Sequence, residues 1–329
     1  MLRRYLVAAL ALAAITLANA PAISADKIVI AEPVHGTGYL PLYVGIRKGF
    51  FAEEGLDVSA LTMLAGGAHR NATLTKQAWG FIGGPEHNAF VKAKGGELRT
   101  VVNIVNRGNV YFVAAKGMTA PSSPKELAGF LRGKKIATSP FGTTPNSITR
   151  YLLVSLGLNP QADVILQEIG PGNELAALQS KQADIAATTE PFLTQGLQRG
   201  IWSDPFYNVP KELGPYAYST INIRQESIET EPETVRKFVR AMSKALLYTL
   251  ENKEEAVAVA KLEFPTMKQE DLMATINRSF EDKLWSEDGS VTPESWTTAH
   301  KVVRTANILK EDVSYDSIIN MTFWKEAKK

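Results

Sequence analysis

Two glutamates stand beside prolines where the sequence predicts helix starts. Glu86 follows Pro85, and Glu190 precedes Pro191. Two carboxyl groups that face each other could carry general acid–base chemistry, although nothing else in the sequence supports hydrolysis. An acid in the first turn of a helix is also ordinary dipole pairing, and Glu190 could simply cap its helix. A functional Glu190 would suggest a ligand with a cationic or hydrogen-bond-donating part.

The residues around Glu86 offer hydrogen-bonding groups. Gly84 and Pro85 open the expected helix, and His87 and Asn88 follow in its first turn. Imidazole and amide donors could bind a carboxylate or a sulfonate. His87 could alternatively be a satisfied surface histidine.

Two aromatic residues are further candidates for ligand binding. Tyr39 and Trp202 could each stack on a ring of the ligand. Residues of this type are more often part of a hydrophobic core, which is the alternative for both.

Signatures of catalysis are missing from the sequence. It contains no Gly-x-Ser-x-Gly or His-Glu-x-x-His motif, and its four histidines are scattered. It has no cysteine, which excludes disulfides, thiolate metal sites and a cysteine nucleophile. We therefore predict no catalytic residues, no metal and no cofactor.

The stretch from Lys135 to Leu158 indicates how binding groups could be positioned. It predicts a strand over Ile136–Ser139, a tight loop over 140–144 and a helix from about Pro145. Gly142 permits the turn, and Thr143 or Thr144 can cap the helix. The unpaired N–H groups and partial positive charge of such a helix start form a general anion-binding device.

A second strand–loop–helix unit resembles the first. Ile28 to Gly49 repeats the pattern, and Gly36 lies 106 positions before Gly142. The segments LTKQAWGFIGGPE and LQSKQADIAATTEP also match, with an offset of 105 between Gln77 and Gln182. We predict two related α/β lobes, each a sheet flanked by helices. Loops at the carboxyl ends of their strands would form a cleft between the lobes.

The expected domain organisation follows the chain. Residues 26–107 form the first part of lobe 1, residues 108–221 form lobe 2, and residues 222–329 form a helical part that covers lobe 1. Ala217 to Ile223 alternates apolar and polar residues like an edge strand and carries the chain back.

Composition and the first residues indicate an exported protein. Arg3 and Arg4 precede an apolar run from Tyr5 to Ala20, which predicts a signal peptide over 1–25, cleaved after Ala22 or Ala25. Without a cysteine there is no lipid anchor, so we expect a periplasmic protein. The remaining chain has 36 − 2 = 34 basic and 34 acidic residues, and this balance excludes the basic excess of a nucleic-acid binder.

Three stretches resemble the periplasmic solute-binding proteins of ABC importers, in the nitrate, sulfonate, taurine and thiamine-precursor branch. They are LPLYVGIRKGFFAEEGLDV, LAGFLRGKKIATSPFGTTPNSITRYLLVSLGL and ALQSKQADIAATTEP, in this order. The resemblance implies a type II periplasmic-binding-protein fold, a two-lobe clamp that delivers a solute to a permease without chemistry. Trp79 departs from the family pattern at a position where an acid is expected, which leaves the local turn open.

The resemblance also implies site residues. In the first lobe they are the loop residues His35, Gly36 and Thr37. In the second lobe they are the anion loop and two later loops, represented by Phe141, Gly142, Thr143, Thr144, Asn146, Gly172, Asn173 and Glu190.

The functional expectation is a monomeric receptor for a small organic acid, either sulfonate-like or aromatic and heteroaromatic. Nitrate or bicarbonate rank lower because Glu86 and Glu190 suit a bare anion poorly. Its partners would be the solute and the transmembrane subunits of an ABC permease, with no nucleic acid. Two alternatives remain open: an enzyme related to the thiamine-pyrimidine synthases of the same fold, and the ligand-binding partner of a membrane sensor.

Overall fold

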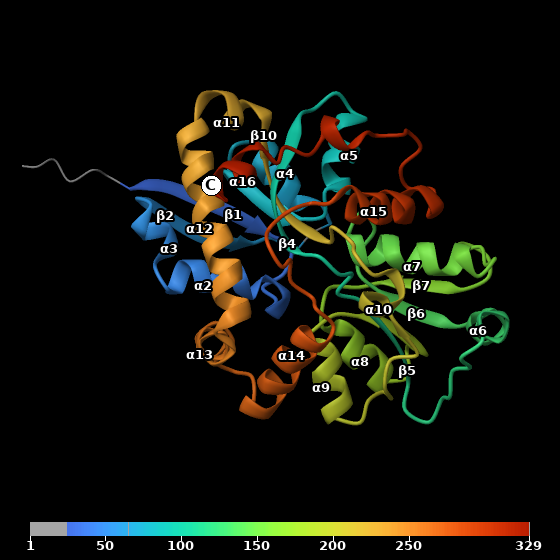
Figure 1. Cartoon of the computed structure of the whole chain (residues 1–329). Coiled ribbons are helices and arrows are strands. Elements are labelled where there is room, and N and C mark those ends of the chain that lie inside the picture. Colours follow the sequence, from blue (N-terminus) through green and yellow to red (C-terminus); the bar gives the residue numbers. More distant parts are fainter. Residues whose placement is uncertain (1–24, 65, 329) are drawn as a thin grey trace, which may run out of the picture.

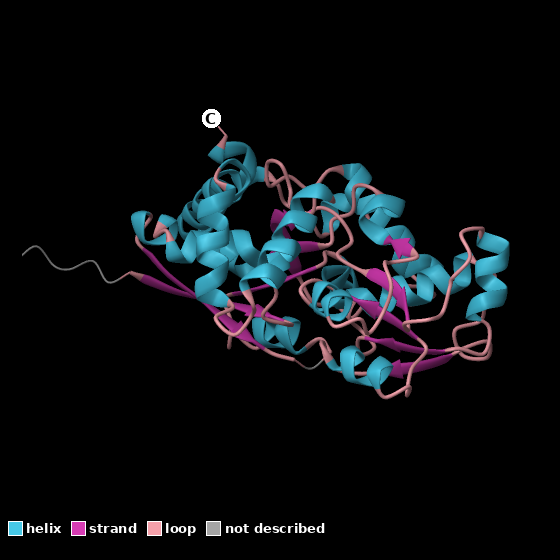
Figure 2. Ribbon diagram, turned by 90° about the horizontal axis from the view of Figure 1, so that it is seen from below, coloured by secondary structure: helices cyan, strands magenta, loops and turns pink. Residues whose placement is uncertain are grey.

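Two five-stranded sheets form the framework of the chain, with strand orders β2-β1-β3-β10-β4 and β7-β6-β8-β5-β9. The computed structural model describes residues 25–64 and 66–328. The expected signal peptide therefore lies outside the described residues, except for Ala25. Helices flank both sheets, and the two sheets lie side by side (Figures 1 and 2). We call each sheet with its flanking helices a lobe, so the predicted α/β two-lobe architecture is confirmed.

The first sheet contains strands from two separate parts of the chain. They are β1 (Asp26–Glu32), β2 (Leu56–Thr62), β3 (Gly80–Gly83), β4 (Leu98–Val105) and β10 (Ser219–Arg224). β1 pairs in parallel with β2 and β3, whereas β10 runs antiparallel between β3 and β4. The first-lobe helical elements before the crossing are η1 (Thr37–Tyr39), α2 (Leu40–Arg47), α3 (Phe50–Glu53), α4 (Ala68–Leu74) and α5 (Glu86–Lys92).

The central position of β10 corrects two expectations. The strand is not an edge strand, and the predicted boundary after residue 221 falls within it, although its six residues all belong to the first sheet. The polar Asn222 in this strand is fully buried. Its side chain accepts a hydrogen bond from Thr100 (2.6 Å) and donates one to the carbonyl of Gly83 (2.9 Å).

The second sheet is continuous in sequence. It consists of β5 (Tyr111–Ala114), β6 (Lys135–Thr138), β7 (Ile165–Glu168), β8 (Ile185–Thr188) and β9 (Tyr207–Asn208). β6 pairs in parallel with β7 and β8, and β5 is antiparallel to β8 and β9. The helices of this lobe are α6 (Pro124–Leu131), α7 (Thr144–Ser155), α8 (Asn173–Gln179), α9 (Phe192–Gln198) and α10 (Val209–Leu213).

The C-terminal part is helical, as expected, but it does not cover the first lobe alone. It contains α11 (Gln225–Thr230), α12 (Pro232–Glu251), α13 (Lys253–Glu263), α14 (Gln269–Glu281), α15 (Pro293–Thr305), η2 (Tyr315–Ser317) and α16 (Thr322–Ala327). α12 packs on α2 and α16, whereas α14 contacts α9 and α15 lies along α7 of the second lobe (Figure 1). The hydroxyl of Tyr111 on β5 donates a hydrogen bond of 2.8 Å to Asp282, just after α14. The last third of the chain therefore joins the two lobes.

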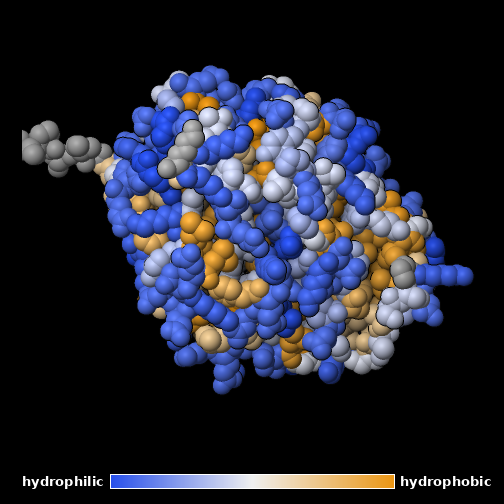
Figure 3. All heavy atoms as spheres, viewed as in Figure 1, coloured by the Kyte–Doolittle hydropathy of each residue, from blue (hydrophilic) through white to orange (hydrophobic). Residues whose placement is uncertain are grey.

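Polar side chains cover most of the face seen in Figure 3, and hydrophobic ones show in small separate areas. Among the residues that the structure describes, no helix combines the length and the apolar character needed to cross a bilayer.

Candidate functional site

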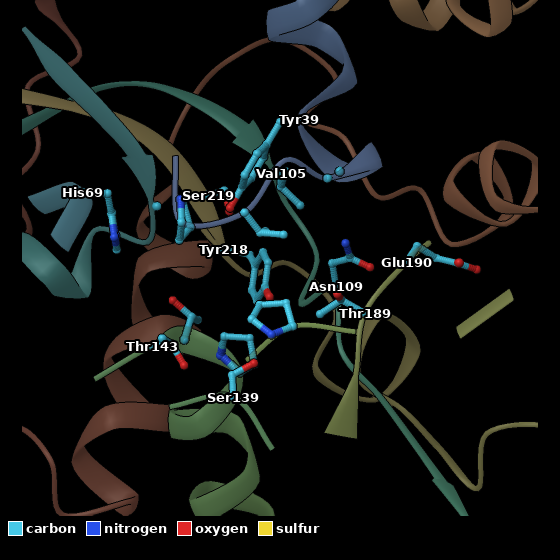
Figure 4. A pocket seen from close by; sticks show the side chains of 18 of the residues that line it. Tyr39, His69, Val105, Asn109, Ser139, Thr143, Thr189, Glu190, Tyr218 and Ser219 are labelled. Carbon is cyan, nitrogen blue, oxygen red and sulfur yellow. The ribbon is translucent and has the colours of Figure 1, made fainter. Parts of the chain in front are cut away.

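A cavity lies where the loops of the two lobes meet (Figure 4). The first lobe contributes residues after β1 and β3, at the end of β4, on α4 and at the start of β10; the second contributes residues after β6, β7 and β8. The cavity volume is about 80 Å³, well above the roughly 10–15 Å³ that holds one water molecule. The parallel strands thus direct their carboxyl ends toward one shared space, as expected for open α/β sheets.

The walls combine aromatic rings with polar groups. Figure 4 shows Tyr39 and Tyr218 between His69 on one side and Asn109 and Glu190 on the other. Buried polar atoms without a partner in the described chain include both ring nitrogens of His69 and the Oδ1 atom of Asn109. A ligand that supplies the missing hydrogen bonds to these atoms gains binding free energy. None of the described residues that line the cavity is Lys or Arg.

One hydrogen bond joins the two lobes beside the cavity. The Oγ1 atom of Thr144, at the start of α7, donates to Oε1 of Glu86, at the start of α5, over 2.5 Å. Glu86 is only 1 % exposed, and its Oε2 atom has no partner among the described residues. Burial raises the pKa of Glu86 to about 7, although the bond from Thr144 opposes this shift. Gly84 leaves the space that the carboxyl group of Glu86 occupies.

Loss of the Thr144 hydroxyl is expected to weaken ligand binding. The variant Thr144→Val removes the bond that joins the closed lobes and leaves a buried carboxyl oxygen unpaired, which costs about 1–3 kcal/mol. The dissociation constant should therefore rise about 10- to 100-fold, as measured by titration calorimetry with a solute that binds. Thr149→Val is the control, because the Thr149 hydroxyl bonds only to Pro145 and Thr138 within the second lobe. Equal affinity of both variants would contradict a closing role for Thr144.

Glu190 lines the cavity, but its carboxylate is already occupied. Oε1 accepts bonds from the hydroxyl of Thr194 (2.8 Å) and from Nε of Arg278 (3.0 Å), and Oε2 accepts one from Thr275 (3.2 Å). Burial raises the pKa of Glu190, and the nearby hydroxyls and Arg278 counteract it. Since Thr275 and Arg278 lie on α14, Glu190 ties the second lobe to the C-terminal helices. None of these contacts joins Glu190 to Glu86, so the two acids do not form the pair that the sequence suggested.

Several predicted residues line the cavity. They are Gly36, Tyr39, His87, Thr143, Thr144 and Glu190. Thr143 occupies the N-cap position of α7 with extended backbone angles, but its hydroxyl donates to the carbonyl of Pro140 instead of capping the helix. Gly142 has a φ of +83°, as its predicted turn requires.

Other predicted residues lie behind the cavity wall and support it. The amide of Asn88 donates to Asn222 (2.8 Å) and Thr100 (3.1 Å) beneath the first sheet. The amide of Asn146 donates to the carbonyl of Ser139 (2.9 Å) and so fixes the loop after β6. Neither Asn88 nor Asn146 belongs to the cavity lining.

In the loop after β1, His35 and Thr37 also lie outside the cavity lining. His35 bonds to the buried Glu32 (3.0 Å) and packs on the rings of Tyr43 and Phe264, outside the cavity. The bond to Glu32 raises the pKa of His35. Thr37 is fully buried and does not belong to the cavity lining.

The remaining predicted residues also lie outside the cavity lining. Trp202 is 1 % exposed and belongs to the core of the second lobe, whereas Phe141 is 55 % exposed. Gly172 faces the ring of Phe192, where a Cβ atom would come within 2.8 Å. Gly84, Pro85, Glu86, Gly142 and Asn173 likewise contribute no surface to the cavity.

Sequence reasoning missed several lining residues, above all His69, Asn109, Tyr218 and Ser219. His69 lies inside α4, and Tyr218 and Ser219 lie where the chain returns to the first lobe, so no local pattern marks them. Asn109 stands in the polar break between the lobes, which was the one available signal. In the described residues, no cluster of three His, Asp or Glu side chains could hold a metal ion.

Sequence comparison identifies related proteins. The family model described as NMT1/THI5 like matches residues 37–256. YtlA of Bacillus subtilis is 24 % identical over 89 % of this chain and 87 % of its own length. The riboflavin-binding protein RibY of Chloroflexus aurantiacus is 25 % identical over 87 % of this chain and 82 % of its own. The 4-amino-5-hydroxymethyl-2-methylpyrimidine phosphate synthase THI5 of Saccharomyces cerevisiae is 25 % identical over 69 % and 68 %.

Solved structures share the fold. The alkanesulfonate-binding protein SsuA of Xanthomonas axonopodis pv. citri, bound to MOPS, superimposes with a TM-score of 0.73 at 12 % identity, covering 92 % of this chain and all of its own. The desulfurization enzyme DszB gives a TM-score of 0.63 at 16 % identity and covers 92 % of this chain and 99 % of its own. The same fold is thus used by binding proteins and by at least one enzyme.

Proposed function

Because the chain belongs to the family described as NMT1/THI5 like, we propose that it is the periplasmic solute-binding component of an ABC importer. It captures a small organic acid between its lobes and delivers it to a membrane permease. The observation that carries this proposal is the cavity at the facing loops of both lobes, which the bond from Thr144 to Glu86 joins beside it. Ligand-favoured closure gives a permease a shape to recognise.

The cavity walls favour an aromatic or heteroaromatic acid over a sulfonate-like or inorganic anion. Tyr39 and Tyr218 offer ring surface, and no described lining residue is a Lys or Arg that could pair with a bare anion. Burial raises the pKa of Glu174, which also lines the cavity. A ligand with a ring and one acidic group therefore matches the walls better than nitrate or bicarbonate. The riboflavin named for RibY and the pyrimidine named for THI5 are heteroaromatic and support the same class.

A thermal-shift panel tests the ligand class. It compares aromatic and heteroaromatic carboxylates, pyrimidines, alkanesulfonates, nitrate and bicarbonate. A ligand present at 100 times its dissociation constant stabilises by about 2.7 kcal/mol, which corresponds to a rise in Tm of roughly 5–10 °C. We expect this rise with aromatic or heteroaromatic compounds, and a much smaller one in Tyr218→Leu. A rise with nitrate or bicarbonate alone would contradict the proposed class.

The carrier and enzyme alternatives differ in what happens to the ligand. The protein is incubated with a compound that raises its Tm. The compound is then recovered, and its molecular mass is measured by mass spectrometry. Unchanged mass supports binding without turnover, whereas a product would support the enzyme alternative. Loss of uptake on deletion of the gene would separate transport from sensing.

A further inference from the structure

Two imidazoles line one end of the cavity, and a guanidinium contacts one of them from outside the lining; α4 and α5 bring the three groups together. His69 and His87 line the cavity, their rings lie 4.9 Å apart at 81°, and Arg70 stands behind His87. We propose that Arg70 fixes the tautomer of His87, so that its Nε2–H group donates a hydrogen bond to an oxygen of the solute's acidic group. This inference rests on the proposed function for its ligand, but its first part concerns the free protein.

The contact between Arg70 and His87 determines where the ring proton sits. Nη1 of Arg70 lies 3.4 Å from Nδ1 of His87, with hydrogen-bonding geometry. A guanidinium has donors but no acceptor, so Nδ1 must accept this bond. A neutral imidazole carries one N–H group, and the proton is therefore on Nε2.

The surroundings of His87 keep the ring neutral. Burial lowers its pKa well below the ordinary value, and the charge of Arg70 lowers it further. From α4 the ring faces His69 and Arg70, from β3 it faces Phe81, and on its own helix it follows Glu86, whose carboxyl group turns to Thr144. His69 does not add charge, because burial lowers its pKa to about 3.

The Nε2–H group of His87 is available to a ligand. The ring has no second hydrogen-bond partner in the described part of the chain, and His87 belongs to the cavity lining. A donor that faces the cavity without a partner is a site for an acceptor atom. Since no described Lys or Arg lines the cavity, this donor, backed by the charge of Arg70, is suited to receive the acidic group of the solute.

Arg70 also lies close to Gly67. Its guanidinium folds over Gly67, where a Cβ atom would come within 2.7 Å of Nη2. In the described residues Arg70 forms no ion pair with a carboxylate, and burial alone lowers its pKa. Its positive charge is therefore directed at His87 without being neutralised by an acid.

Nitrogen NMR of the unliganded protein tests the first part. Histidine labelled with ¹⁵N is followed from pH 5.5 to 8 in wild type, Arg70→Met and the exposed control Arg199→Met. We expect the Nε2–H tautomer and no protonation of His87 in wild type and control, and a mixture of tautomers in Arg70→Met. An Nδ1–H tautomer in wild type, or an unchanged tautomer in Arg70→Met, would overturn the role of Arg70. The Tm of each variant shows whether it is folded.

Affinity measurements test the contact with the solute, using pyridine-3-carboxylate and its uncharged amide as probes. Glutamine places an N–H group near the position of Nε2, whereas asparagine does not. We therefore expect His87→Gln to keep affinity for the carboxylate, and His87→Asn and Arg70→Met to lose about tenfold, more for the carboxylate than for the amide. Equal loss in both His87 variants, or no binding to wild type at millimolar concentration, would reject the solute contact, while the NMR result on Arg70 stands separately.

Discussion

Replacing Trp202 with alanine is expected to lower the free energy of unfolding by about 3–5 kcal/mol, the usual range for a buried tryptophan. Trp202 packs in the core of the second lobe with Tyr111, Val113 and Leu193, and its Nε1–H group donates to the carbonyl of Leu193 over 3.0 Å. Alanine would leave a cavity and remove this hydrogen bond. Urea unfolding followed by circular dichroism measures the change.

Two controls separate this core role from the ligand contact that the sequence suggested. Trp202→Phe keeps most of the ring and should cost clearly less. Gly196→Ala should destabilise without touching any polar group, because a Cβ atom there would lie 1.9 Å from the Trp202 ring. If Trp202→Ala left stability unchanged but abolished ligand binding, Trp202 would be a ligand residue after all.

Stability of the wild-type protein is expected to fall as the pH rises through 7, and Glu86→Gln should remove a large part of this fall. Burial raises the pKa of Glu86 from 4.5 to about 7. A raised pKa means that the folded protein holds a proton that the unfolded chain releases, so the stabilising contribution is complete below pH 4.5 and is lost as the pH passes 7. This change in pKa corresponds to about 3 kcal/mol. Glutamine keeps an oxygen that accepts the bond from Thr144 but cannot ionise.

Urea midpoints at pH 4.5, 6, 7 and 8 provide the test. The buried Glu174 and Glu190 have raised pKa values too, and their effect is present in both proteins, so the difference between wild type and Glu86→Gln isolates Glu86. We expect little difference at pH 4.5 and a more stable variant at pH 8. A constant difference across this range would show that Glu86 does not bind a proton on folding.

The repeated strand–loop–helix units could be predicted because their signals are local. A glycine and threonine loop after an apolar strand marks Gly36 and Thr143, and both lie in the cavity wall. The alternation in β10 was misread, because period-two patterns assume that polar residues face water. Asn222 instead lies in a buried network with Asn88 and Thr100, and only the tertiary fold supplies these partners.

The lining of the cavity likewise depends on the tertiary fold. The sequence could indicate helix starts, but not which side chain at each start turns inward. Thr144 lines the cavity, while Asn146, two residues later, turns back to Ser139. His69 could not be singled out, because it reaches the cavity only through the packing of α4 over Gly83 of β3.

The place of β10 has a consequence for biosynthesis. Because β10 pairs with both β3 and β4, the two strands present unpaired edges until residue 224 has left the ribosome. The lobe whose synthesis starts first is thus completed after the other one, and its nascent half needs protection from association with other exposed strands.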